Sequence, residues 1–293
     1  MKRLFALEFS RLRRQTSTWV IGLIILILGG LNVMISLAFS FPEEDGTRSF
    51  IFTSRSILES SFQLGQIQIL LIGVIASLFI ASDISQGTIR NKIIAGHSKF
   101  EIYLVQMGMS IAITVIGLML FHALPTAFSW LITFPITVDD GGSFANFLIH
   151  MSFGYFLVIT GVLVTTWIAL RTKNTASAII FTLLIFVLGP TLSTIALSLV
   201  QGLALLNLDQ FADAAEYVKI QAQVIDIFEW VYFYQLNRLA NIGTFFDLVG
   251  ITNLNFFNPN TIPFILKTLI SNAILLALVI GLGGRRFAQS DLR

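Results

Sequence analysis

A polar stretch between two long apolar runs has the residue types and spacing best suited to a specific interaction. It covers residues 83–101 and reads DISQGTIRNKIIAGHSKFE. Thr88 is suited to begin a short helix, because its hydroxyl can accept a hydrogen bond from an unpaired N–H of the first turn. Gly96 is suited to end that helix in the left-handed conformation. Ser98 and Glu101 have the spacing of a capping box, which predicts a second helix directly afterwards.

The short helix has an apolar face and a charged face. Ile89 and Ile93 are four residues apart and therefore share one face, while Arg90 and Lys92 are expected to turn away from it. Two interpretations are open at this point. The stretch is either an ordinary turn between two membrane helices or a docking helix whose apolar face binds a protein partner.

The composition is that of a membrane protein. Hydrophobic residues make up 55% of the 293 residues and charged residues 12%, whereas soluble domains carry about twice that charge. The chain is expected to form a single membrane domain, residues 1–293, because no long polar block remains for a second one. The net charge of +2 gives no indication of nucleic acid binding. Cysteine is absent, which excludes disulfides, thiolate metal sites and cysteine nucleophiles.

Apolar runs of about 20 residues, the length that crosses a bilayer as a helix, set the expected topology. The predicted spans are residues 19–41, 64–81, 102–124, 147–170, 176–200 and 262–283. Pro125 is expected to mark the outer end of the third span, and Pro190 to kink or break the fifth. The fold class predicted is all-α, a polytopic membrane protein with six transmembrane helices.

The first 18 residues are predicted to form an interfacial helix. Five Lys and Arg residues surround apolar ones there, and Leu4, Leu7 (with Glu8) and Leu12 approximate a helical stripe that suits the membrane surface. A signal peptide is the alternative. It is rejected because the following run, residues 19–41, is too long and has no small-residue cleavage site after it.

The distribution of Lys and Arg predicts the orientation. Thirteen of the 18 fall in segments on the side of the N-terminus, and five, Arg48, Arg55, Lys219, Arg238 and Lys267, fall elsewhere. Because cytoplasmic segments are enriched in positive charge, both termini and residues 83–101 are expected to be cytoplasmic.

The longest outer segment, residues 201–260, is predicted to be extracellular and helical. Apolar residues recur every seven positions at Phe211, Val218, Ile225, Tyr232 and Leu239. Residues 207–239 therefore read as one or two amphipathic helices, and the ring-rich residues 228–234 favour the membrane–water boundary. The segment is interpreted as a cap packed on the spans; a substrate-binding module is the alternative.

The sequence lacks the motifs of several enzyme classes. It has no Gly-x-x-x-x-Gly-Lys-Ser/Thr phosphate loop and no His-Glu-x-x-His metal motif, and His97, His122 and His150 are far apart. No catalytic, cofactor-binding or metal-binding residue is therefore predicted. Ser and Thr in the spans are expected to join helices. The spans hold almost no charged residues at mid-depth, which argues against an ion-coupled transporter, so energy for transport would come from outside the chain.

Part of the polar stretch resembles the loop after the second span of type-2 ABC transporter permeases. The similar residues are 87–96, GTIRNKIIAG, followed by Ser98, Lys99, Glu101, Ile102 and Tyr103. These are bacterial exporter subunits related to bacitracin-resistance and bacteriocin-immunity permeases. The terminus, with Arg285, Arg286, Phe287, Asp291 and Leu292, is also similar, as is the basic helix before the first span.

The resemblance implies a multi-pass protein of the bacterial cell membrane with a coupling loop at residues 83–101. Carried over to this chain, the residues in or beside the coupling helix are Gly87, Thr88, Ile89, Arg90, Lys92 and Ile93. The implied partners are an ABC ATPase subunit, which binds ATP and magnesium, a second permease subunit, identical or homologous, and membrane lipids. The chain itself then holds no cofactor and is not an enzyme.

The function expected from this resemblance is export of amphipathic or hydrophobic molecules, such as antimicrobial peptides or lipid-like compounds. The long outer segment departs from shorter family members, so their substrates do not transfer directly. The alternative is a membrane sensor or scaffold that binds a ligand through its outer segment.

Overall fold

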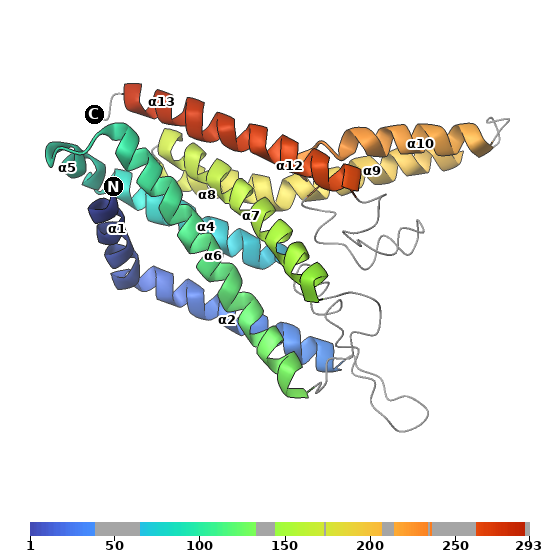
Figure 1. Ribbon diagram of the computed structural model, residues 1–293, viewed down its shortest axis with the longest axis horizontal. Helices are drawn as coiled ribbons and strands as arrows, with labels where there is room; N and C mark the ends of the chain where they lie inside the picture. The colour runs from blue at the N-terminus through green and yellow to red at the C-terminus, as the bar shows by residue number, and fades with distance from the viewer. Residues whose placement is uncertain are drawn as a thin grey trace.

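The computed structural model describes residues 1–38, 65–132, 144–172, 174–206, 214–233, 235 and 262–290. Every regular element in these ranges is a helix, which confirms the all-α prediction. The long helices form an elongated bundle. Both termini and the short helix α5 (Thr88–Ile94) lie at one end of it, and α10 (Ala214–Phe228) lies at the far right of Figure 1.

The chain begins with two helices that meet at an angle. Helix α1 (Lys2–Arg14) is bent by 69° relative to α2 (Thr16–Ala38), with Gln15 in an extended conformation between them. The buried positions of α1 are Leu4, Glu8 and Leu12. Leu7, predicted to share this stripe, is instead 67% exposed, because a four-residue spacing follows one face of the helix more closely than the predicted spacing does.

The middle of the chain holds α4 (Gly65–Ser85), α5 and α6 (Lys99–Ile132), with α5 bent by 62° from α4. Helix α6 continues through Pro125 to Ile132, while the candidate span within it covers Lys99–Leu124. Pro125 therefore does not end the helix, and its place at the outer end of the third span stays a prediction. Membrane helices can contain proline where neighbouring groups satisfy the carbonyl that it frees.

The last spans both contain a π-helical turn. Helix α7 (Phe144–Thr172) is followed by α8 (Thr175–Leu183), the turn η1 (Leu184–Leu188) and α9 (Gly189–Leu206). Pro190 is the second residue of α9, with one residue between it and η1. The fifth span is not broken there, and the irregularity near Pro190 is this π-helical turn. The C-terminal helix runs through α12 (Ile262–Ala277), η2 (Leu278–Leu282) and α13 (Gly283–Gln289).

Four described helices are long and apolar enough to cross a membrane, or up to six if each bent pair counts as one span. The exact number of six spans, the interfacial position of α1 and the sidedness stay predictions.

Helix α6 lies at the centre and packs on α2, α4 and α7. Hydroxyl pairs join neighbouring helices in this core, as predicted. Ser77 and Thr182 lie 2.9 Å apart between α4 and α8, and Ser110 and Thr166 lie 2.7 Å apart between α6 and α7. All four side chains are fully buried, so these hydroxyls serve helix packing.

The described part of the outer segment packs on the spans, as the cap interpretation expects. Helix α10 ends at Phe228, the chain turns at residues 229–231, and residues 232, 233 and 235 are helical again. The described part of the predicted range 207–239 is therefore helical on both sides of this turn. The Tyr232 hydroxyl donates to the Leu157 carbonyl of α7 (2.9 Å). Gln235 donates to the Ser271 hydroxyl of α12 (2.9 Å). Phe211, Leu239 and residues 42–62 lie outside the described residues.

Candidate functional site

The turn between α4 and α5 is made by Gly87, whose φ of 68° is one that other residues rarely adopt. Gly87, and not Thr88, occupies the N-cap position of α5. The prediction that Thr88 caps the helix is wrong because its hydroxyl is a donor to Asp83 instead. Its oxygen lies 2.8 Å from the Asp83 carbonyl and 2.5 Å from Asp83 Oδ1.

The end of α5 follows the prediction. Gly96 has a φ of 92°, its N–H donates to the Ile93 carbonyl (3.0 Å), and the next N–H, of His97, donates to the Lys92 carbonyl (3.1 Å). This pair of bonds is a Schellman motif. Together, the two left-handed glycines fix where α5 begins and ends.

The capping box at the start of α6 is half formed. The Ser98 hydroxyl accepts from the Glu101 N–H (3.1 Å), as predicted. The Glu101 carboxylate binds elsewhere, to the amino group of Met1 and to Nδ1 of His97, the latter at 3.3 Å. Glu101 thereby holds the start of the chain against α6.

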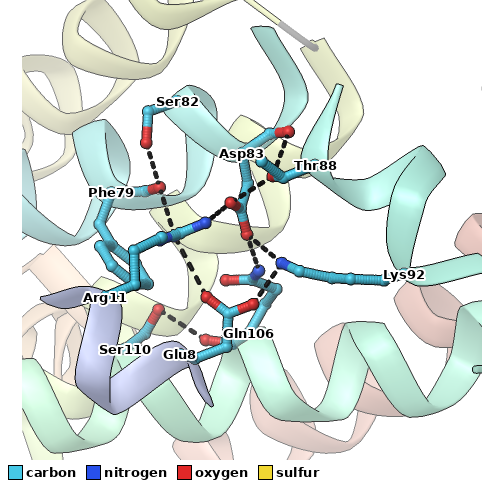
Figure 2. A network of polar contacts seen from close by, with 9 residues as sticks. All are labelled: Glu8, Arg11, Phe79, Ser82, Asp83, Thr88, Lys92, Gln106 and Ser110. Carbon is cyan, nitrogen blue, oxygen red and sulfur yellow. Dashed lines mark hydrogen bonds and ion pairs between the residues drawn. The ribbon is translucent and has the colours of Figure 1, made fainter. Parts of the chain in front are cut away.

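Four charged side chains from three helices meet beside this turn (Figure 2). Glu8 and Arg11 come from α1, Asp83 from the end of α4, and Lys92 from α5. The Asp83 side chain is 0% exposed and that of Glu8 2%, while Lys92 is 13% exposed. Two acids and two bases give this charged cluster a formal charge of zero.

Asp83 is the centre of the charged cluster. Its Oδ1 pairs with Arg11, and its Oδ2 pairs with Lys92 at 2.5 Å and accepts from the Gln106 amide of α6. Lys92 also pairs with Glu8, and Arg11 Nη2 lies 3.2 Å from Glu8 Oε2. Each carboxylate therefore contacts both cations, and the cluster joins α1, α4, α5 and α6.

Arg11 also contacts the body of α4. Its guanidinium lies 4.0 Å from the centre of the Phe79 ring, and Nη2 donates to the Phe79 carbonyl (3.3 Å). A cation over an aromatic face adds attraction. Burial lowers the pKa of Arg11 and of Lys92, and the charge of Glu8 opposes both shifts.

The charged cluster and Gln106 lie inside a single family match. Residues 4–189, more than half of the chain, match the family model for ABC-2 family transporter protein. The chain belongs to this family. It matches no curated protein. As a family member it is a multi-pass membrane permease of an ABC transporter, a transport component and not itself catalytic, and the family implies association with an ABC ATPase subunit. This favours a permease over a sensor or scaffold. The closer relation to bacitracin-resistance and bacteriocin-immunity permeases stays a prediction.

The permease uses the predicted apolar face of α5 internally. Ile89 is 3% exposed, and Ile93 is partly buried and packs against the core. Lys92, expected to turn outwards, points into the charged cluster. The apolar residue that α5 presents to the outside is Ile94, at 75% exposed. Spacing identified which residues share a face of α5, but not that the permease itself covers that face.

Sequence reasoning placed Glu8 and Arg11 in the N-terminal helix, Asp83 in the loop at residues 83–101 and Gln106 in the third span, and did not connect these three segments. One signal was available for Glu8: it is spaced four residues from both Leu4 and Leu12, on the buried stripe of α1. An acid on such a stripe needs a buried partner. No comparable signal pairs Glu8 with Lys92, because they are 84 positions apart.

The two histidines whose side chains the structure describes, His97 and His122, bind to different parts of the permease. His122 is 5% exposed, and its Nδ1 lies 2.8 Å from the Leu118 carbonyl and 3.3 Å from the Tyr155 hydroxyl of α7. His97 pairs with Glu101, and the side chain of His150 lies outside the described residues. Within the described ranges, no group of three or more His, Asp or Glu side chains is placed to hold a metal ion.

Proposed function

We propose that the permease is the membrane-spanning subunit of an ATP-driven exporter and that α5 is its coupling helix. The ABC ATPase subunit, which binds ATP and magnesium, docks on α5 at the cytoplasmic side of a bacterial cell membrane, where both termini also lie. A second permease subunit completes the translocation path. The observation that carries this proposal is that α5 combines an exposed outer face with ion pairs to α1 and α4, and that Asp83 of α4 is in turn hydrogen-bonded to α6.

The inner side of α5 supports transmission of movement. Ile89 is buried in the core, and Lys92 pairs with Glu8 of α1 and Asp83 of α4, which in turn binds Gln106 of α6. Separating any of these pairs would leave a buried charge without its partner, at a cost of several kcal/mol. A force on α5 would therefore move α1, α4 and α6 with it.

The outer side of α5 supports docking. Arg90, Asn91 and Ile94 are all exposed. Burying an exposed isoleucine side chain in a partner's pocket contributes about 1.5–3 kcal/mol. Gly87, Thr88, Ile89, Lys92 and Ile93 then belong to the coupling helix as residues that position it, and Arg90 and Ile94 as residues that contact the ATPase.

Ile94→Asp is expected to reduce association with the ABC ATPase by at least tenfold, because a carboxylate would replace the apolar contact. The measurement is the amount of ATPase that co-purifies with tagged permease from its own cells. Ile227→Asp is the matched control, since Ile227 is 67% exposed on α10, away from the termini. Wild-type recovery of the ATPase with Ile94→Asp would contradict the assignment of this face.

The proposed substrates are amphipathic or hydrophobic, such as peptides or lipid-like compounds. Residues 102–132 of α6, 144–170 of α7 and 175–206 of α8 and α9 contain no Asp, Glu, Lys or Arg. The buried hydroxyl pairs between Ser77 and Thr182 and between Ser110 and Thr166 are already used for helix packing. A strongly hydrated solute would find few partners to replace its lost hydration there.

ATP hydrolysis by the purified complex in lipid nanodiscs is expected to rise severalfold with amphipathic peptides or single-chain lipids and to stay at the basal rate with sugars or amino acids. The measurement is phosphate release against substrate concentration. Saturable stimulation by a hydrophilic solute alone would contradict the proposed substrate class.

A further inference from the structure

A pocket of about 360 Å³ opens where α6, α7 and α13 meet. Its walls include three aromatic residues, Tyr103, Trp167 and Phe287, and two arginines, Arg171 and Arg286. These residues come from the start of α6, the end of α7 and the C-terminal helix, so the pocket lies at the end of the bundle that carries both termini (Figure 1).

The floor of the pocket is aromatic. Tyr103 is fully buried, and its hydroxyl donates to the Val279 carbonyl in η2 (2.6 Å). The Tyr103 and Phe287 rings lie 5.7 Å apart. Gly283 allows α13 to approach this closely, because a Cβ there would overlap the Tyr103 hydroxyl and lie 2.7 Å from the Trp167 ring.

The rim of the pocket is positively charged. The side chains of Arg171 and Arg286 are exposed, and the Arg171 guanidinium lies 5.8 Å from the centre of the Trp167 ring. Lys99 adds a third positive charge nearby, because its amino group donates to the carbonyl of Ser290, another wall residue (2.6 Å). None of the wall residues that the structure describes is acidic. Between described residues, no ion pair occupies Arg171 or Arg286.

We propose that this pocket binds the phosphate headgroup of an anionic phospholipid. The phosphate would lie between Arg171 and Arg286, since a guanidinium presents paired N–H donors that match phosphate oxygens. The glycerol end of the acyl chains would contact the aromatic floor, because Trp and Tyr rings favour the headgroup level of a bilayer. Basic pockets between spans at the cytoplasmic side suit anionic headgroups.

The size and position of the pocket support a lipid over a free ion. Its volume falls in the range of small-molecule sites, about 300–1,000 Å³, and exceeds the space that inorganic phosphate fills. The pocket is positioned by α13 and η2, which lie outside the matched residues 4–189. This proposal does not rest on the coupling role of α5, and the two can fail separately.

The test is native mass spectrometry of the permease released from nanodiscs that contain equal amounts of phosphatidylglycerol and phosphatidylcholine. The wild type is expected to retain phosphatidylglycerol preferentially, and the Arg171→Gln/Arg286→Gln double variant to retain at least tenfold less, since two charge-assisted contacts are lost. Arg285→Gln is the matched control: it removes the same charge from the same helix but does not line the pocket, and should retain phosphatidylglycerol like the wild type.

Three results would overturn the proposal. They are unchanged retention in the double variant, an equal loss in Arg285→Gln, and full displacement of phosphatidylglycerol by millimolar inorganic phosphate, which would identify a soluble phosphate as the ligand.

Arg171→Lys/Arg286→Lys separates binding from folding, because it keeps the charge and loses the paired donors. Retention between that of the wild type and that of the double Gln variant supports the proposal. Retention as low as in the double Gln variant, with an unchanged melting temperature, also supports it by showing that the guanidinium geometry is required.

Discussion

Asp83→Asn is expected to lower the free energy of unfolding of the permease by about 3–5 kcal/mol, the usual cost of removing one partner from a buried charge pair. Asp83 is fully buried and contacts Arg11, Lys92, Gln106 and Thr88. Asparagine preserves the shape but leaves the cluster with a charge of +1. Arg11 and Lys92 would then share Glu8 as their remaining acid in the cluster. Denaturant titration of the purified permease in detergent measures the loss.

A second substitution distinguishes a charge effect from a packing effect. Lys92→Met on the Asp83→Asn background returns the cluster to neutrality and is expected to recover part of the loss, so the two changes should be non-additive by about 1 kcal/mol or more. Asp226→Asn is the control. Asp226 also pairs with a lysine, Lys267, but its side chain is 63% exposed, and exposed pairs contribute about 1 kcal/mol or less. Equal losses for Asp83→Asn and Asp226→Asn would contradict the central role of the cluster.

Local rules predicted much of the fold correctly. The apolar runs gave the helices their approximate places, because length and hydropathy alone decide which segments can cross a bilayer. The end of α5 at Gly96 and the start of α6 at Ser98 followed from backbone chemistry within a few residues. Pro190 follows the π-helical turn η1, whereas Pro125 leaves α6 continuous. The difference depends on neighbours that a local pattern does not contain.

The charged cluster could not be predicted from such local rules. Glu8, Asp83 and Gln106 are brought together by the packing of α1 and α4 on α6, and no periodicity links positions so far apart. Thr88 illustrates the consequence, since its hydroxyl would suit an N-cap in isolation but binds the buried carboxylate five residues earlier. Ile89 illustrates it again, because a short helix with one apolar face can bind its own bundle as well as a partner.

Two aromatic residues of the outer segment, Tyr232 and Phe233, pack against glycines of the spans. A Cβ at Gly161 of α7 would overlap the Tyr232 hydroxyl and lie 2.8 Å from the Phe186 ring, and one at Gly189 would overlap the Phe233 ring. The absence of a side chain at Gly161 is what allows Tyr232 to reach the Leu157 carbonyl. These contacts hold the described outer segment against α7 and α9.

Gly161→Ala is therefore expected to lower the free energy of unfolding by about 2–4 kcal/mol, as the sum of overpacking and a lost hydrogen bond. Tyr232→Phe alone should cost about 1 kcal/mol, the usual value of one such bond. On the Gly161→Ala background the same change should cost nothing or restore stability, because it removes the atom that the new methyl group meets. Recovery stays partial, since Phe186 remains in place. Gly22→Ala of α2 is the control, because its new methyl group would meet open space. It should leave stability unchanged or raise it by up to about 1 kcal/mol, the gain in helix propensity. Simple additivity of Gly161→Ala and Tyr232→Phe would show that the hydroxyl and the glycine do not meet.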